Sequence, residues 1–134
     1  MPGPVLIIED EPDIAEVLRY SLQRAGFQTL VARSGEEGLE TALDHMNPPS
    51  FILLDPVLPG ISGAETHRRL RSEPSTHRTP ILIITAKGME SDNRAIIRLG
   101  ANDYIVKPFS VRQVVAQVRS LLSTDYTDSI NQSV

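Results

Sequence analysis

The feature that most constrains the fold of this chain is an alternation between very short apolar runs and longer segments with helical spacing. The runs are Val5–Ile8, Thr29–Ala32, Phe51–Leu54, Ile81–Ile84 and Tyr104–Val106. Each is only a few residues long, and most are almost wholly apolar. Such runs are typical of strands that are buried on both faces, which is the situation in a parallel sheet.

The segments between the runs carry the signals of helices. Residues 13–23 form an apolar stripe at helical spacing, with Pro12 near its start and Gly26 past its end. The other helix signals are capping boxes that begin at Ser34 and Ser62, residues 92–99 before Gly100, and a start at Ser110. Five strands alternating with five helices predict an α/β fold of the (βα)5 type with a doubly wound parallel sheet, because parallel neighbours need a helical crossover.

Length and composition fit one globular domain. The chain has 134 residues, of which 40% are hydrophobic and 22% charged, and its formal net charge is −4. An acidic chain is not expected to bind nucleic acid directly. It has no cysteine for disulfides or thiolate metal sites, and no apolar run that resembles a membrane span or an export signal, so we expect a cytoplasmic protein. We expect the domain to span residues 1–123, and the polar residues 124–134 to fray or to begin a linker.

Polar side chains collect where the predicted strands end. They are Glu9 and Asp10 after the first strand, Asp55 after the third, and Thr85 and Lys107 at the last two. Because the carboxyl ends of parallel strands meet at one edge of the sheet, these side chains are expected to converge. Each alone is most easily interpreted as a loop or capping residue, but the five together indicate a site. Oxygen ligands without His or Cys favour Mg²⁺, and a carboxylate beside a lysine and a hydroxyl suits phosphoryl transfer to a carboxylate oxygen.

Four stretches of the sequence carry a resemblance to a known family. They read VLIIEDEPDI, FILLDPVLPGISG, ILIITAKG and GANDYIVKPFS. In this order they resemble the response-regulator receiver domain of two-component signalling, over residues 4 to about 123. The likeness is closest to receivers that carry a C-terminal winged-helix DNA-binding domain. It implies a CheY-like, flavodoxin-like three-layer sandwich with strand order 2-1-3-4-5.

The resemblance also implies a role for the acids at the strand ends. Asp55 would accept the phosphoryl group. Asp10 and Asp55 would bind Mg²⁺ directly, Glu9 would do so through water, and the backbone carbonyl of Val57 would be a further ligand.

Further implied roles concern the phosphoryl group and the response to it. Lys107 would pair with the phosphoryl oxygens, and the peptide bond after it would be cis. Thr85 would donate its hydroxyl, and the backbone N–H groups of Val57 and Ala86 would bind phosphoryl oxygens. Tyr104 would be the switch aromatic that turns inward as Thr85 moves.

The implied function is a signalling switch rather than an enzyme. A sensor histidine kinase or a small phosphodonor would supply the phosphoryl group, and the altered surface would control a partner protein or an output domain. The alternative is a degenerate receiver that acts as a phosphorylation-independent interaction module. Its mark would be a missing acid, threonine or lysine, and none of these is missing. The sequence fits both a single-domain regulator and a fragment of a longer one.

Some positions depart from the pattern of the family. Pro56 directly follows Asp55, where a residue with an N–H is more usual, and we interpret it as tolerated. Asn93, Asn102 and Gln117 stand where charged residues would support a homodimer through the fourth helix, fifth strand and fifth helix, so that dimer is in doubt.

The histidines and one arginine cluster are interpreted as ordinary surface residues. His45, His67 and His77 lie on no motif, and we expect them to be mostly exposed. Arg68, Arg69 and Arg71 are expected to form a solvated helix face rather than a phosphate-binding patch.

Overall fold

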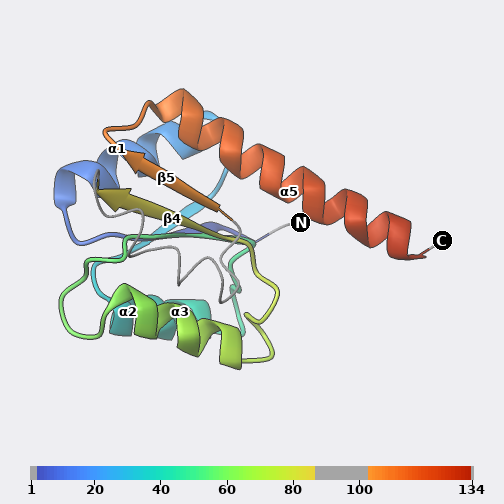
Figure 1. Cartoon of the computed structure of the whole chain (residues 1–134), viewed down its shortest axis with the longest axis horizontal. Coiled ribbons are helices and arrows are strands. Elements are labelled where there is room, and N and C mark those ends of the chain that lie inside the picture. Colours follow the sequence, from blue (N-terminus) through green and yellow to red (C-terminus); the bar gives the residue numbers. More distant parts are fainter. Residues whose placement is uncertain (1–2, 87–102, 134) are drawn as a thin grey trace.

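Five parallel strands form the central layer of the computed structural model, which describes residues 3–86 and 103–133 (Figure 1). The strands are β1 (Val5–Ile8), β2 (Thr29–Ala32), β3 (Phe51–Leu54), β4 (Ile81–Ala86) and β5 (Asp103–Lys107). Their order in the sheet is β2-β1-β3-β4-β5, and all neighbouring pairs are parallel. The predicted fold class and strand order are therefore confirmed.

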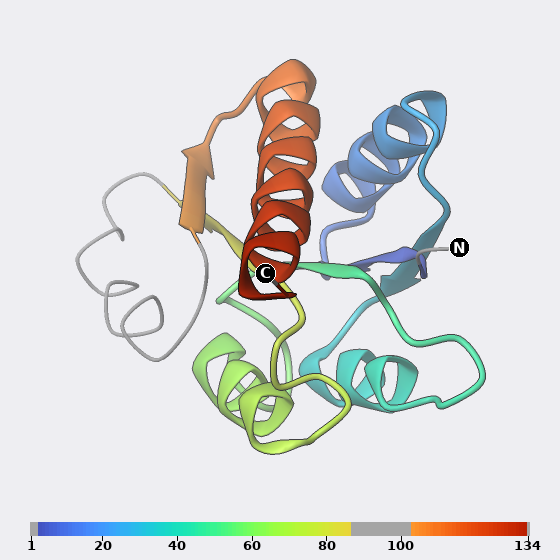
Figure 2. The same ribbon diagram turned by 90° about the vertical axis from the view of Figure 1, so that its right-hand side faces the viewer.

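Helices cover both faces of the sheet. They are α1 (Pro12–Arg24), α2 (Gly35–Ala42), α3 (Gly63–Ser72) and α5 (Val111–Ser133). In Figures 1 and 2, α1 and α5 lie on one face, and α2 and α3 lie on the other. The helix predicted over residues 92–99 lies outside the described residues.

Two of the helices begin where the capping boxes placed them. The Ser34 hydroxyl accepts a hydrogen bond from the backbone N–H of Glu37, and the Ser62 hydroxyl accepts one from Glu65. A side-chain oxygen at this position satisfies one of the backbone donors that a helix start leaves without a partner. The starts of α2 and α3 are therefore encoded locally in the sequence.

The short apolar runs are explained by two separate cores, one on each face of the sheet. Every residue of β1 and β3 is buried. On β1, Leu6 and Ile8 belong to the cluster beneath α2 and α3, whereas Val5 and Ile7 belong to the cluster beneath α1 and α5. Because successive side chains of a strand point to opposite faces, a central strand covered on both faces must be apolar at every position.

The C-terminal helix is longer than the sequence predicted. Residues 124–134 are expected to fray or to begin a linker, but α5 continues to Ser133 and extends beyond the sheet (Figure 1). The apolar stripe ends near Leu122, and it therefore does not mark the end of the helix. Neither Gly nor Pro occurs after Pro108, so nothing in the sequence stops the helix earlier. Where the domain itself ends stays a prediction.

None of the helices in the described part of the chain is both long and apolar enough to cross a membrane.

Candidate functional site

The register of the sheet brings the acids together. Ile8 of β1 pairs with Leu54 of β3, so the next residues, Glu9 and Asp55, leave the sheet side by side. The Asp55 N–H donates to the Ile8 carbonyl at 3.0 Å, which holds the chain in strand geometry up to the carboxylate. Lys107 ends β5 at the same edge. Strand pairing therefore places side chains together that are far apart in the sequence.

Lys107 is the electrostatic centre of this edge. Its Nζ lies 3.3 Å from Oε1 of Glu9 and 3.3 Å from Oδ2 of Asp55. The Glu11 carboxylate is 4.0 Å away. The peptide bond between Lys107 and Pro108 is cis, as the resemblance implied. One ammonium group thus bridges two buried carboxylates.

Burial and charge act against each other here. Glu9 is 1% exposed and Asp55 is 5% exposed. Burial, together with the neighbouring Asp55, raises the pKa of Glu9 from 4.5 to about 8, although Lys107 works in the opposite direction. Burial works to lower the pKa of Lys107, but the charges of Asp55 and Glu9 outweigh it and raise that pKa. The pocket favours a cation and disfavours a second full negative charge.

The acids fit a divalent cation. Glu9, Asp10 and Asp55 each offer one carboxylate oxygen, and these three oxygens lie within 4.8 Å of one another. The other oxygen of Glu9, Oε2, is buried and has no hydrogen-bond partner among the described residues. A donor set made only of carboxylate oxygens suits a hard ion such as Mg²⁺. A buried carboxylate oxygen without a partner from the protein, such as Oε2 of Glu9, is expected where an ion or its bound water is the partner.

A cavity of about 210 Å³ opens above this cluster. Asp10, Glu11, Asp55, Val57 and Lys107 line it. The backbone N–H of Val57 donates to Oδ1 of Asp55 at 2.8 Å, which orients the carboxylate from the loop side. The cavity is small and within reach of solvent, and charged groups of both signs line it.

Thr85 and Tyr104 lie at the margin of this site rather than in the cavity lining. Thr85 is fully buried at the end of β4, and Tyr104 is partly buried against the cluster beneath α2 and α3. Tyr104 pairs in register with Ile83, two residues before Thr85. Since alternate strand residues share a face, Thr85 and Tyr104 lie on the same face of the sheet. Ala86 pairs in register with Lys107.

Pro56 is half-buried and takes part in the start of α3. Its carbonyl accepts a hydrogen bond from the Gly63 N–H at 3.0 Å. A Cβ at Gly63 would overlap the Pro56 backbone, so the close approach requires glycine at position 63. The contacts that hold Asp55 come from Ile8, Val57 and Lys107, and none of them needs an N–H at position 56.

One residue at the cavity was left out of the predicted set, and one other prediction is wrong. Glu11 lines the cavity and approaches Lys107, and it directly follows Asp10 in the sequence, which was the available signal. His45 and His77 are exposed, but His67 is fully buried. His67 lies three residues before the buried Leu70, and therefore on the same face of α3, so helical spacing contained the signal.

Comparison with known proteins agrees with this geometry. The family described as the response regulator receiver domain matches residues 5–119. The chain belongs to this family. Receiver domains of two-component response regulators are phosphorylation-activated switches that take phosphate from histidine kinases and act on output domains, and they typically bind Mg²⁺ at an acidic cluster.

Individual relatives support the same assignment of this receiver domain. It is 39% identical over 118 residues to the phosphate regulon transcriptional regulatory protein PhoB of Rhizobium meliloti, covering 88% of this chain and 51% of that protein. It is 38% identical over 133 residues to the transcriptional regulatory protein SrrA of Staphylococcus aureus, covering 99% and 53%. A crystal structure of a protein from Chloroflexus aurantiacus J-10-fl, assigned to the response regulators, superposes with a TM-score of 0.84 at 37% identity, covering 92% and 99%. The receiver domain spans about half the length of these curated relatives.

Proposed function

We propose that Asp55 is the phospho-acceptor of this receiver domain. The observation that carries the proposal is the position of the Lys107 ammonium, 3.3 Å from the carboxylates of both Asp55 and Glu9 at a cavity open to solvent. Asp55 lines the cavity, and its carboxylate has a cation beside it. One oxygen of Asp55 would attack the phosphorus of a phosphohistidine or an acyl phosphate, forming a P–O bond while the bond from phosphorus to the donor breaks.

The bound metal would be Mg²⁺. Asp10 and Asp55 would bind it directly, Glu9 through water, and the Val57 carbonyl would complete the protein ligands. When bound, the ion supplies positive charge that neutralises the phosphoryl oxygens during transfer. Lys107 would contribute a second positive charge and move from its present bridge towards the new phosphoryl group.

The same arrangement supports a switch through Thr85 and Tyr104. Phosphorylation adds roughly −1.5 to −2 charge at pH 7 and new acceptor oxygens. The Thr85 hydroxyl and the N–H groups of Val57 and Ala86 would bind those oxygens, and Tyr104 would repack on the face that it shares with Thr85. The altered surface beside β5 would then be recognised by a downstream protein or an output domain.

The partners follow from this scheme. A sensor histidine kinase would donate the phosphoryl group. A homodimer through helix 4, β5 and α5 stays in doubt, because Gln117, at a position where a charge was expected, donates a hydrogen bond to Asp103 within the chain. Asn93 and Asn102 lie outside the described residues.

Incubation with acetyl phosphate and Mg²⁺ tests the proposal. Intact-mass analysis is expected to show one added phosphoryl group, which should be lost with Asp55→Asn and when EDTA replaces Mg²⁺. Asp44→Asn, at an exposed position, is the matched control. If the native chain stays unmodified, the degenerate-receiver alternative holds, and modification that persists in Asp55→Asn would place the acceptor elsewhere.

A second variant separates acceptance from response. Thr85→Ala should still accept one phosphoryl group from acetyl phosphate, because Asp55, Lys107 and the acids are unchanged. The phosphorylation-dependent chemical shift changes around Tyr104 should be lost. The same shift changes in Thr85→Ala and in the native chain would contradict the role of the threonine.

A further inference from the structure

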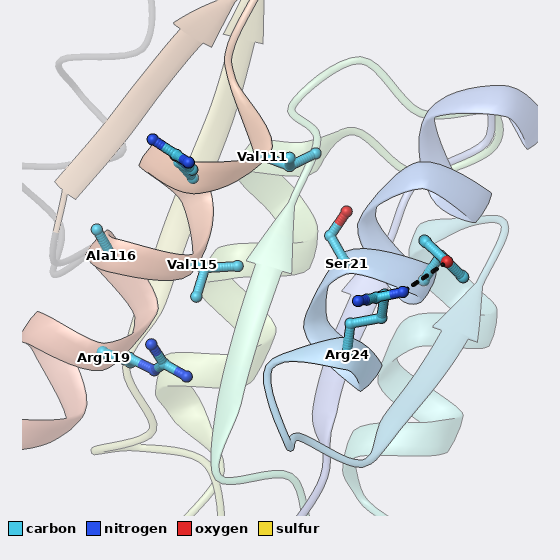
Figure 3. A pocket seen from close by; sticks show the side chains of 8 residues that line it. Ser21, Arg24, Val111, Val115, Ala116 and Arg119 are labelled. Carbon is cyan, nitrogen blue, oxygen red and sulfur yellow. Dashed lines mark hydrogen bonds between the residues drawn. The ribbon is translucent and has the colours of Figure 1, made fainter.

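A second cavity lies between α1 and α5, on the face of the sheet opposite α2 and α3. Its volume is about 400 Å³, and it shares no lining residue with the cavity above Asp55. Figure 3 shows Ser21 and Arg24 on α1 facing Val115 and Arg119 on α5. We refer to this cavity, lined by residues of both helices, as the α1–α5 groove.

The walls of the groove are apolar. Val111 and Val115 come from α5, and the Tyr20 ring comes from α1. Tyr20 is 55% exposed and Val111 is 38% exposed. Their exposed surface would become buried if the groove were filled by an apolar body, and burial of apolar surface is favourable. A volume of this size is in the range of small-molecule sites, which are mostly apolar with a few convergent polar groups.

The charges around the groove are all of one sign. Arg24, Arg112 and Arg119 line it, and no carboxylate does. Arg24 donates to the Tyr20 hydroxyl and lies over its ring, and Arg119 donates to the Ala25 carbonyl at the end of α1. Among the described residues none of the three forms a salt bridge, whereas Arg19, Arg68 and Arg69 all pair with glutamates. Three uncompensated guanidinium groups gather on a chain whose net charge is −4.

We propose that the α1–α5 groove binds a small organic anion, with an apolar body about the size of a fused ring and a carboxylate or phosphate at its end. The body would lie against Val111, Val115 and the Tyr20 ring. The anionic group would bind the guanidinium groups, whose planar arrangement of donors matches a carboxylate or a phosphate. This site is separate from the phospho-acceptor site, because the two cavities share no lining residue.

Titration of the ¹⁵N-labelled chain tests the site, in magnesium-free buffer, with 2-naphthoate and 2-naphthyl phosphate as probes. Saturable chemical shift changes are expected at the amides of α1 and α5. The neutral isostere 2-naphthamide should bind about tenfold more weakly, since a charge-assisted contact is worth roughly 1.5 kcal/mol or more. Acetate, which has the charge without the apolar body, should cause no saturable change. The ratio of the affinities for the two naphthyl probes identifies the preferred anionic group.

Substitutions test whether the arginines of the groove, rather than other surface residues, bind the anionic group. Arg24→Gln combined with Arg112→Gln should weaken 2-naphthoate binding about tenfold or more. Arg112 makes no hydrogen bond within the described part of the chain, so Arg112→Gln alone is a variant whose folding is not at risk, and it should weaken binding severalfold. Arg68→Gln, on the opposite face of the sheet, is the matched control and should bind as the native chain does. Four results would each overturn the proposal. They are equal affinities for 2-naphthamide and 2-naphthoate, chemical shift changes centred on Lys107, no saturable chemical shift change, and an unchanged affinity for 2-naphthoate in both arginine variants.

Discussion

Buried His67 should make the stability of the domain depend on pH between about 7.5 and 5. The side chain is 0% exposed, and neither ring nitrogen has a hydrogen-bond partner among the described residues. Burial, together with the positive charge of Arg71, lowers its pKa from 6.5 to about 4. The folded protein therefore binds a proton at this site much more weakly than the unfolded chain does.

The sign and size of the effect follow from that difference. At pH 7.5 the imidazole is almost wholly neutral in both states, so it contributes little pH dependence there. As the pH falls from 6.5 towards 4, only the unfolded state takes up the proton, so the free energy of unfolding decreases. At pH 5 the loss is about 2 kcal/mol, since each pKa unit corresponds to about 1.4 kcal/mol and the full difference is reached only below pH 4.

Urea denaturation of the native chain and of His67→Leu at pH 7.5 and pH 5, followed by circular dichroism, measures this loss. On going to pH 5, the native chain should lose about 2 kcal/mol more than His67→Leu. Glu9, whose pKa is raised to about 8, acts in the opposite direction, but it is present in both proteins and cancels in the comparison. His77→Gln, at an exposed position, should behave as the native chain does. Equal losses in the native chain and His67→Leu would refute the reasoning.

Three further predictions rest on single contacts. Calorimetry should show weaker Mg²⁺ binding in Asp10→Asn than in the exposed control Asp13→Asn, because only Asp10 belongs to the carboxylate cluster. Equal affinities in the two variants would show that Asp10 does not bind the metal. Gly63→Ala should destabilise the fold by about 1–3 kcal/mol in urea denaturation, because a Cβ there overlaps the Pro56 backbone, and a change below about 0.5 kcal/mol would contradict that packing. Ser62→Ala should cost about 1 kcal/mol through loss of the cap on α3, whereas the exposed Ser72→Ala should cost less, and similar values would count against the cap.

The strands and the acidic edge could be predicted from the sequence because both depend on local rules. An apolar run without alternation indicates a strand covered on both faces, and a helical crossover makes its neighbour parallel. Once the strands are parallel, their carboxyl ends must share one edge of the sheet. The proximity of Glu9, Asp55 and Lys107 can therefore be predicted before any distance is known. Two of the three arginines of α3 follow the same rule, since Arg68 and Arg69 have Glu65 within one helical turn. Arg71 does not belong to the expected solvated face, because it is half-buried and donates to the backbone carbonyls of Thr76, His77 and Thr79.

What could not be predicted depends on how separate elements pack. His67 is not such a case, because the sheet-facing stripe of α3 includes position 67 whatever residue stands there, and helical spacing therefore indicates its burial. The α1–α5 groove, in contrast, is beyond sequence reasoning. Arg24 and Arg119 are 95 positions apart and become neighbours only because both helices cover the same face of the sheet. Local pairs of opposite charge are visible in the sequence, whereas a group of like charges assembled from two helices becomes visible only when the helices are packed.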